Sequence, residues 1–265
     1  QDAADNPEAA YARLLAGAVA MKRHLEPDVR AELDACAAAA GVAPDELVLA
    51  QLFGDVDRAQ AAEDEASASE TEGEEEARSS GRGLVSRSRS PHGPRKVDEF
   101  MALDRAPTGR CDPPPAPRRH SFACSSFAAF GEATAGGRPL VGRNFDFAGH
   151  GLEESIHLIL QEIPEGPGAG QPFVTVGYAG ILNGWSAMNA DGLFASNNTL
   201  LGESDSVEGI STCFLLRKIV ERGRTVEDGV DIVRKGPRAC GTGMLVAGRN
   251  RAGAWDARFV EFDHD

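Results

Sequence analysis

The sequence predicts an α+β layered domain that follows a small group of helices. From about residue 120 onward, apolar segments of strand length are separated by glycine-rich turns at residues 135–138 and 189–192. Two helical segments, at 206–222 and 225–235, interrupt this series before strands return. Strands followed by helices and then strands favour an antiparallel meander covered by helices over alternating βαβ units. The expected strands are 125–130, 140–147, 155–163, 173–178, 182–188, 193–198, 243–247 and 255–262.

The first 57 residues are typical of helices. Apolar residues recur at helical spacing, Pro27 begins a second helix, Gly41 ends it, and Pro44 begins a third. These helices carry apolar faces, so we expect another layer to cover them. The chain is accordingly divided into a helical region at 1–57, a linker at 58–122 and an α+β domain at 123–265.

The predicted linker is low in complexity. Acidic residues with Ser and Ala give way to Arg-Ser repeats and then to a proline-rich run at 113–117. Such a composition buries too little apolar surface to offset the entropy of ordering, which predicts a disordered or loosely attached segment. The Arg-Ser run at 87–90 is compatible with a phosphorylation or RNA-binding tract, although a solvated linker is the commoner meaning of mixed charge.

Composition narrows the classes of function. The chain of 265 residues has a formal net charge of -14 and a pI near 4.9, which disfavours nucleic acid or an anionic membrane as a partner. No apolar run reaches the roughly 18 residues of a membrane span. The six histidines show no metal-ligand spacing and no phosphate-binding loop is present, so neither a metal nor a cofactor is expected.

Localisation and assembly stay open at this level. The first residue is Gln1, which is compatible with a removed signal peptide and hence a secreted or periplasmic protein, with a trimmed chain, or with a fragment. Without a signal peptide the protein is expected in the cytoplasm. The sequence does not indicate an oligomeric state.

Cysteine usage singles out Cys124. Five cysteines form no CxxC pair, and we interpret Cys36, Cys213 and Cys240 as small buried apolar residues. Cys124 stands where the low-complexity tract ends and the first strand begins. A chain break there would make it an N-terminal residue whose α-amino group, with a reference pKa of about 7.7 to 8.0, could take the thiol proton.

Arg143 and Asp146 follow on the next predicted strand. A hairpin centred near residues 136–137 would place Asp146 opposite roughly Phe127 and return Arg143 to the neighbourhood of Cys124. A guanidinium near a thiol favours the thiolate, and Asp146 could orient the guanidinium or a terminal ammonium. A surface Arg-Asp pair on a hairpin explains the same spacing equally well.

The segment 196–199 supplies candidate hydrogen-bond donors. The side-chain amide of Asn198 suits the oxyanion of a tetrahedral intermediate, where losing a donor costs roughly 3 to 4 kcal/mol, although paired Asn residues are also ordinary turn formers. Aromatic residues on strands either line an acyl pocket or belong to the core. The candidates are Phe127, Phe145, Tyr178, Trp185 and Phe194, and the predicted substrate-binding residues are Trp185, Tyr178 and Asn197.

Taken together, the runs at 124–129, 142–146 and 188–193, with Asn198 six residues past Gly192, resemble the linear-amide C-N hydrolases. More closely, they resemble the branch that contains the acyl-coenzyme A:6-aminopenicillanic acid acyltransferases, peptidase family C45. The upstream runs at 32–42 and 45–47 are similar to the helical pro-region of that family. The resemblance covers about residues 28–55 and 123–262.

This resemblance implies a four-layer αββα sandwich of the N-terminal-nucleophile (Ntn) hydrolases. It implies a precursor cut between Ala123 and Cys124 by Cys124 itself, with both resulting chains remaining associated. Cys124 would then attack a small-molecule linear amide to form a thioester, Asn198 would stabilise the oxyanion, and Arg143 and Asp146 would tune the nucleophile. Water or an amine would resolve the thioester.

The chain departs from the family pattern at three points. Ala123 stands where Gly is common, the linker is unusually long, and fewer residues follow Cys124 than in the family. The sandwich is therefore expected to be incomplete at its C-terminus. An additional substrate-orienting group at residues 240–243 fits the resemblance but has no matching motif.

Other readings of the same residues are kept as alternatives. Ser125 and Ser126 lack the Gly-x-Ser-x-Gly elbow of a serine hydrolase. A Cys-His pair of Cys124 with His150 or His157 would need no chain break. A truncated or inactive relative, acting through its low-complexity tract as an interaction protein, is the alternative that is not an enzyme.

Overall fold

The computed structural model describes residues 6–80, 124–146, 157–166, 168–200, 202 and 204–264, and for 68–80 it describes the backbone alone. The chain divides into two compact units, one formed by residues 1–66 with 122–265 and the other by 67–121. The helices up to residue 66 and all the strands therefore belong to one unit, which contains the candidate site.

The second and third N-terminal helices begin at Pro27 and Pro44, where the sequence analysis expects them. The N-terminal helices are α1 (Pro7–Lys22), α2 (Pro27–Ala40) and α3 (Pro44–Ser80), and each begins at a proline. Gly41 ends α2 in the left-handed conformation with φ 70°, which glycine adopts without steric cost. The structure places residues 58–80 in α3, so this helix continues well into the segment expected to be a linker. The rest of the predicted linker lies outside the described residues.

A six-stranded antiparallel sheet forms the centre of the unit. Its strands follow one another in space in their chain order, which confirms the predicted meander. They are β3 (His157–Glu162), β4 (Phe173–Tyr178), β5 (Ser186–Asn189), β6 (Phe194–Thr199), β7 (Thr242–Arg249) and β8 (Trp255–Phe262).

A separate two-stranded hairpin consists of β1 (Cys124–Gly131) and β2 (Gly137–Phe145). The predicted hairpin is confirmed, but its expected register was wrong. Phe127 pairs with Gly142 instead of Asp146, and Cys124 pairs with Phe145, so Asp146 lies just beyond the ladder. The turn begins at Gly131 (φ 62°), well before residues 136–137, because this glycine leaves the extended conformation and the register shifts beside it.

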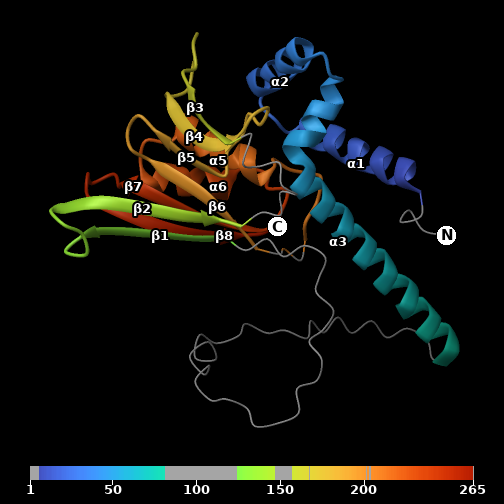
Figure 1. The fold of residues 1–265 in the computed structure, drawn as a ribbon. Helices are drawn as coiled ribbons and strands as arrows, with labels where there is room; N and C mark the ends of the chain where they lie inside the picture. The colour runs from blue at the N-terminus through green and yellow to red at the C-terminus, as the bar shows by residue number, and fades with distance from the viewer. Residues whose placement is uncertain are drawn as a thin grey trace. The chain divides into compact units, whose positions relative to one another are not determined.

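Helices and hairpin cover opposite faces of the sheet, which confirms an α+β sandwich (Figure 1). Helix α5 (Thr212–Arg222) packs on β5 and β6, and α6 (Val226–Lys235) packs on β7 and β8, while β1 lies against β6, β7 and β8. Helix α6 has the expected N-cap at Thr225, but α5 begins six residues later than predicted. Among the described residues no helix covers the outer face of the hairpin, where Phe127 and Leu140 are exposed.

One continuous core joins the N-terminal helices to the sheet. Buried side chains of α1, α2 and α3 belong to the same cluster as those of α5, α6 and the strands. Its largest fully buried members are Met21, Leu33, Leu52, Leu193, Leu215, Leu216, Ile219 and Met244. The predicted need of the helices for an apolar partner is met within this unit.

Among the described residues no single helix has both the length and the apolar character of a membrane span. Helix α2 and residues 44–67 reach that length and apolar character only when taken together, and the two segments are bent by 118° relative to each other.

Candidate active site

Cys124 and Arg143 meet on the inner face of the hairpin. Arg143 pairs with Ser126 across the hairpin, and side chains two residues apart on a strand share a face, so Cys124, Ser126 and Arg143 point the same way. The Arg143 Nη2 atom lies 3.2 Å from the Cys124 Sγ atom. Cys124 is half-buried.

The backbone of β6 holds Arg143 in this position. The Nε and Nη2 atoms of Arg143 donate to the Asn197 carbonyl over 3.2 and 2.8 Å. This carbonyl is available because β5 and β6 are paired only up to Ser186 and Ser196. Burial lowers the pKa of Arg143, and interaction with Cys124 is the largest opposing influence. The guanidinium is thus bound to the sheet on one side and to the sulfur on the other.

An aromatic cluster adjoins the guanidinium. Arg143 Cζ lies 4.5 Å from the centroid of the Phe145 ring, which stacks on Trp185 at 5.1 Å. Tyr178 packs edge-on against Trp185 at 5.5 Å, and His157 stacks on Tyr178 at 4.7 Å. The structure therefore brings the predicted substrate-binding residues Tyr178 and Trp185 to the neighbourhood of Arg143, where Tyr178 is buried and Trp185 is half-buried.

Asn197 and Asn198 face opposite sides of the sheet. The Asn198 side chain points towards the hairpin and its Nδ2 donates to Ser126 Oγ over 2.8 Å. The Asn197 side chain points towards α5, with Nδ2 3.9 Å from Cys213 Sγ. Asn197 therefore contributes its carbonyl to the site, and strand alternation places its side chain on the helix-covered face. Its predicted role in substrate binding stays a prediction.

Asp146 makes no hydrogen bond or ion pair with Arg143 among the described residues. Its carboxylate is exposed, and both oxygens accept from Asn144 Nδ2 at 2.9 Å. Its charge acts on Arg143 only through space, which raises the pKa of Arg143. Ala123 and the alternative partner His150 lie outside the described residues.

Two of the three other cysteines assigned to the interior are buried there. Cys213 and Cys240 are buried, as predicted, and burial raises the pKa of both thiols. Cys36 is only partly buried, contrary to the prediction, because it lies on a less covered side of α2.

A polar face of α3 was missed by the sequence analysis. Gln51, Asp55 and Arg58 recur at helical spacing, and each binds backbone groups of the second half of the chain. Gln51 exchanges hydrogen bonds of 2.7 Å with Gly180 and Leu182, and Arg58 Nη2 donates over 2.7 Å to the carbonyls of Leu200 and Gly241. The sequence signal was three polar residues at i, i+4 and i+7 beside the apolar stripe of a helix.

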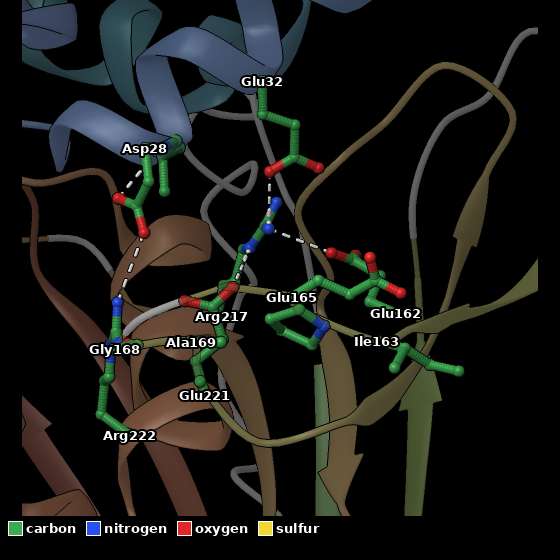
Figure 2. Close-up of a pocket in the computed structure, with 13 residues that line it drawn as sticks. Asp28, Glu32, Glu162, Ile163, Glu165, Gly168, Ala169, Arg217, Glu221 and Arg222 are labelled. Atoms are coloured by element: carbon green, nitrogen blue, oxygen red, sulfur yellow. Dashed lines mark hydrogen bonds and ion pairs between the residues drawn. The ribbon is translucent and has the colours of Figure 1, made fainter.

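A cavity of about 410 Å³ lies between α2, α5 and the segment after β3 (Figure 2). Arg217 reaches three carboxylates around it, Glu32 at 2.7 Å, Glu162 at 3.0 Å and Glu221 at 2.8 Å. Burial raises the pKa of Glu162 to about 7, against the attraction of Arg217. The residues that line this cavity are separate from those around Cys124.

Within the described part of the chain, no three His, Cys, Asp or Glu side chains are grouped to hold a metal ion.

Parts of the chain are similar to known proteins. Residues 133–256 match the family model described as acyl-coenzyme A:6-aminopenicillanic acid acyl-transferase. A protein of Archaeoglobus fulgidus, described only as uncharacterized, is 28% identical over 141 residues, which cover 51% of this chain and 23% of that protein. This chain therefore spans less than a quarter of the length of that relative.

A solved structure, the Caenorhabditis elegans N-acylethanolamine-hydrolyzing acid amidase ortholog, is similar over 54% of this chain and 64% of that chain. Its sequence identity is 15% and its TM-score is 0.38. The family match agrees with the resemblance predicted from the sequence, and residues 133–256 are similar to the acyl-coenzyme A:6-aminopenicillanic acid acyltransferases.

Proposed function

We propose that this chain is a self-cleaving cysteine amidohydrolase or acyltransferase that acts on a linear amide through a thioester. The observation that carries the proposal is the 3.2 Å contact between Arg143 Nη2 and Cys124 Sγ. A guanidinium at that distance stabilises a thiolate over a thiol, and the thiolate is the nucleophilic form of cysteine.

The first step is opening of the backbone. The Cys124 sulfur attacks the carbonyl carbon of Ala123, the C-N bond breaks, and the acyl group moves to sulfur. Water then hydrolyses this thioester, which frees the Ala123 carboxylate and the α-amino group of Cys124. That amine has a reference pKa of about 7.7 to 8.0, so it serves as a base near neutral pH.

The second step repeats the chemistry on a substrate. The thiolate attacks the amide carbonyl, and the α-amino group of Cys124 delivers the thiol proton to the leaving amine. Water then releases a carboxylate from the thioester, or a second amine accepts the acyl group. The Asn198 side-chain amide, held by Ser126, is the proposed donor to the oxyanion.

The aromatic cluster suggests where an acyl group would bind. The rings of Phe145, Tyr178 and Trp185 gather next to Arg143. An apolar acyl chain or ring placed against them would have its carbonyl near the sulfur. We therefore propose Tyr178 and Trp185 as substrate contacts, and the substrate as a small-molecule amide with an apolar acyl part.

The intact mass of the purified protein is the decisive measurement. We expect two chains that meet at residue 124, slower cleavage in Cys124→Ser, and none in Cys124→Ala. Ser125→Ala is the matched control because Ser125 is exposed on the outer face of the same strand. A Cys124→Ala protein that still divides there would assign the cut to another protease.

The processed protein should then be screened against N-acyl amides, penicillins, bile-salt conjugates and small peptides. Turnover that is lost on alkylation of Cys124 would support the proposal. An uncut chain that turns over an amide would favour a Cys-His hydrolase, and an uncut chain without turnover would favour an inactive relative that acts as an interaction protein.

A further inference from the structure

Asp55 of α3 supplies the capping hydrogen bonds of α5. Its Oδ2 atom accepts from the Thr212 backbone N-H over 2.7 Å, and both carboxylate oxygens lie within 3.2 Å of Thr212 Oγ1. Ser211, the residue at the N-cap of α5, makes no side-chain capping bond, and the first turn of α5 contains no acidic residue. A carboxylate from another part of the chain thus takes the place of a local cap.

The environment makes this contact costly to lose. Asp55 is 8% exposed and Thr212 is 4% exposed, so water does not readily replace the lost acceptor. The positive end of the α5 dipole also favours a negative charge at this position. The backbone carbonyl of Asp55 further accepts from Cys240 Sγ over 3.4 Å, which fixes this turn of α3 against the start of β7.

From the first turn of α5, contacts lead to the nucleophile. Cys213 follows Thr212 directly, and its sulfur lies 3.9 Å from Asn197 Nδ2. The carbonyl of the same Asn197 accepts both hydrogen bonds that hold Arg143 on the sheet. Arg143 in turn contacts Cys124. Every side chain between Asp55 and the sulfur is at least partly buried.

We infer that Asp55 is a positioning residue for Cys124. It fixes the start of α5, the first turn of α5 contacts Asn197, and the Asn197 carbonyl holds the guanidinium of Arg143. This inference depends on the proposed pairing of Arg143 with Cys124. It makes the helices before the proposed cleavage point part of the site, so that loss of the chain before residue 124 would remove the positioning carboxylate.

The test measures the alkylation rate of Cys124 by iodoacetamide from pH 5 to 10, followed by peptide mass spectrometry so that each cysteine is resolved. In Asp55→Ala we expect the midpoint to rise by at least about half a pH unit, which is about threefold less thiolate at neutral pH. Asp55→Asn should restore most of the wild-type midpoint, because Asn is nearly as good a capping acceptor as Asp.

Val56→Ala is the matched control. Val56 is the fully buried neighbour of Asp55, so its truncation also destabilises α3, but its side chain packs against Gly17 of α1. A midpoint that rises equally in Val56→Ala and Asp55→Ala would overturn the inference, because general loosening would then explain both. Equal midpoints in Asp55→Ala and the wild type would also overturn it.

A second variant covers the case in which Asp55→Ala does not fold. Thr212→Val removes the hydroxyl donor and keeps the backbone hydrogen bond to Asp55. Its midpoint of Cys124 alkylation should therefore lie between that of the wild type and the higher value expected when the cap is lost completely. A wild-type midpoint in Thr212→Val would count against the inference. If Arg143→Gln leaves the wild-type midpoint unchanged, the proposed role of Arg143 fails first, which separates failure of the proposed function from failure of this inference.

Discussion

At the scale of single residues, Arg143 is the side chain on which the proposed chemistry depends most. Its forked guanidinium donates to the Asn197 carbonyl and reaches the Cys124 sulfur at the same time. A lysine ammonium keeps the charge but lacks the planar fork, so it cannot maintain both contacts in the same geometry.

We predict that Arg143→Lys raises the pH midpoint of Cys124 alkylation, and that Arg143→Gln raises it further, because the cation 3.2 Å from the sulfur is displaced or lost. The measurement is the alkylation rate of Cys124 against pH. Arg138→Gln is the control, because Arg138 is an exposed arginine of the same strand. An Arg143→Gln midpoint equal to that of Arg138→Gln would show that the guanidinium does not act on the sulfur.

Glu162 gives a prediction about stability and pH. Burial raises its pKa to about 7 in the folded protein, whereas an unfolded Glu titrates near 4.3. The folded state therefore binds more protons between these values, and the contribution of Glu162 to the free energy of unfolding falls as pH rises from about 4 to about 7. This loss is complete about one pH unit above 7.

In Glu162→Gln we expect the free energy of unfolding to decrease less between pH 5 and pH 8 than in the wild type. Urea unfolding at pH 5, 6, 7 and 8 measures this difference. Glu165→Gln, at an exposed position shortly after Glu162, should keep the wild-type pH dependence. A Glu162→Gln curve parallel to the wild-type curve would mean that the carboxylate stays charged over this range.

At the scale of elements, the packing of α6 on the sheet depends on Gly229. A Cβ atom at this position would lie 2.8 Å from Val246 Cγ1 and 3.1 Å from Ile219 Cγ2, and both of those side chains are fully buried. Alanine would gain about 1 kcal/mol of helix propensity, but overpacking in a core costs about 1 to 3 kcal/mol. The packing cost should therefore prevail.

We predict that Gly229→Ala lowers the melting temperature, and that Gly229→Ala with Val246→Ala is less destabilised than the sum of the two single changes. Differential scanning calorimetry gives both values. Gly54→Ala is the control, since Gly54 also lies in a helix but a Cβ there meets nothing within 4 Å, so this change should raise the melting temperature. Additive effects at Gly229 and Val246 would show that the helix simply shifts.

The order of the strands could be predicted because glycine turns and apolar segments are local signals. The hairpin register could not, because it depended on where the chain first leaves the extended conformation, and that was Gly131 instead of the pair at 136–137. The start of α5 was also missed for a physical reason. Its capping carboxylate, Asp55, lies 157 residues earlier in the chain, so no local pattern marks Thr212 as the first helical residue.

The candidate site was also only partly predictable from the sequence. The sequence predicted that a hairpin would return Arg143 towards Cys124, but the contact itself depends on the observed register, which pairs Arg143 with Ser126 and places both side chains on the inner face. The contribution of the Asn197 carbonyl was not predictable, because it depends on where β5 and β6 cease to pair. The residue type at a position does not indicate whether its backbone carbonyl is free to accept a hydrogen bond.

At the scale of the whole molecule, the helices before the linker and the strands after it fold around one core. Leu52 is 1% exposed and belongs to the same buried cluster as Leu193 and Met244. Truncation of such a side chain costs about 2 to 5 kcal/mol. This is a large share of the free energy of unfolding of a typical domain, which is about 5 to 15 kcal/mol.

We predict that residues 124–265 expressed alone lack a cooperative unfolding transition, and that co-expression with residues 1–80 restores it. Circular dichroism during thermal unfolding measures the transition. The control is co-expression with a 1–80 fragment that carries Leu52→Ala, which should restore less. A cooperative transition of the isolated 124–265 fragment would show that the helices are dispensable for folding.

The polar face of α3 has a practical consequence for protein production. Gln51 satisfies the backbone at Gly180 and Leu182, and Arg58 satisfies it at Leu200 and Gly241. A recombinant gene trimmed to begin at Cys124 would leave these groups unpaired, and its product would be prone to form inclusion bodies. A bicistronic vector that encodes both halves is the sounder route to crystals.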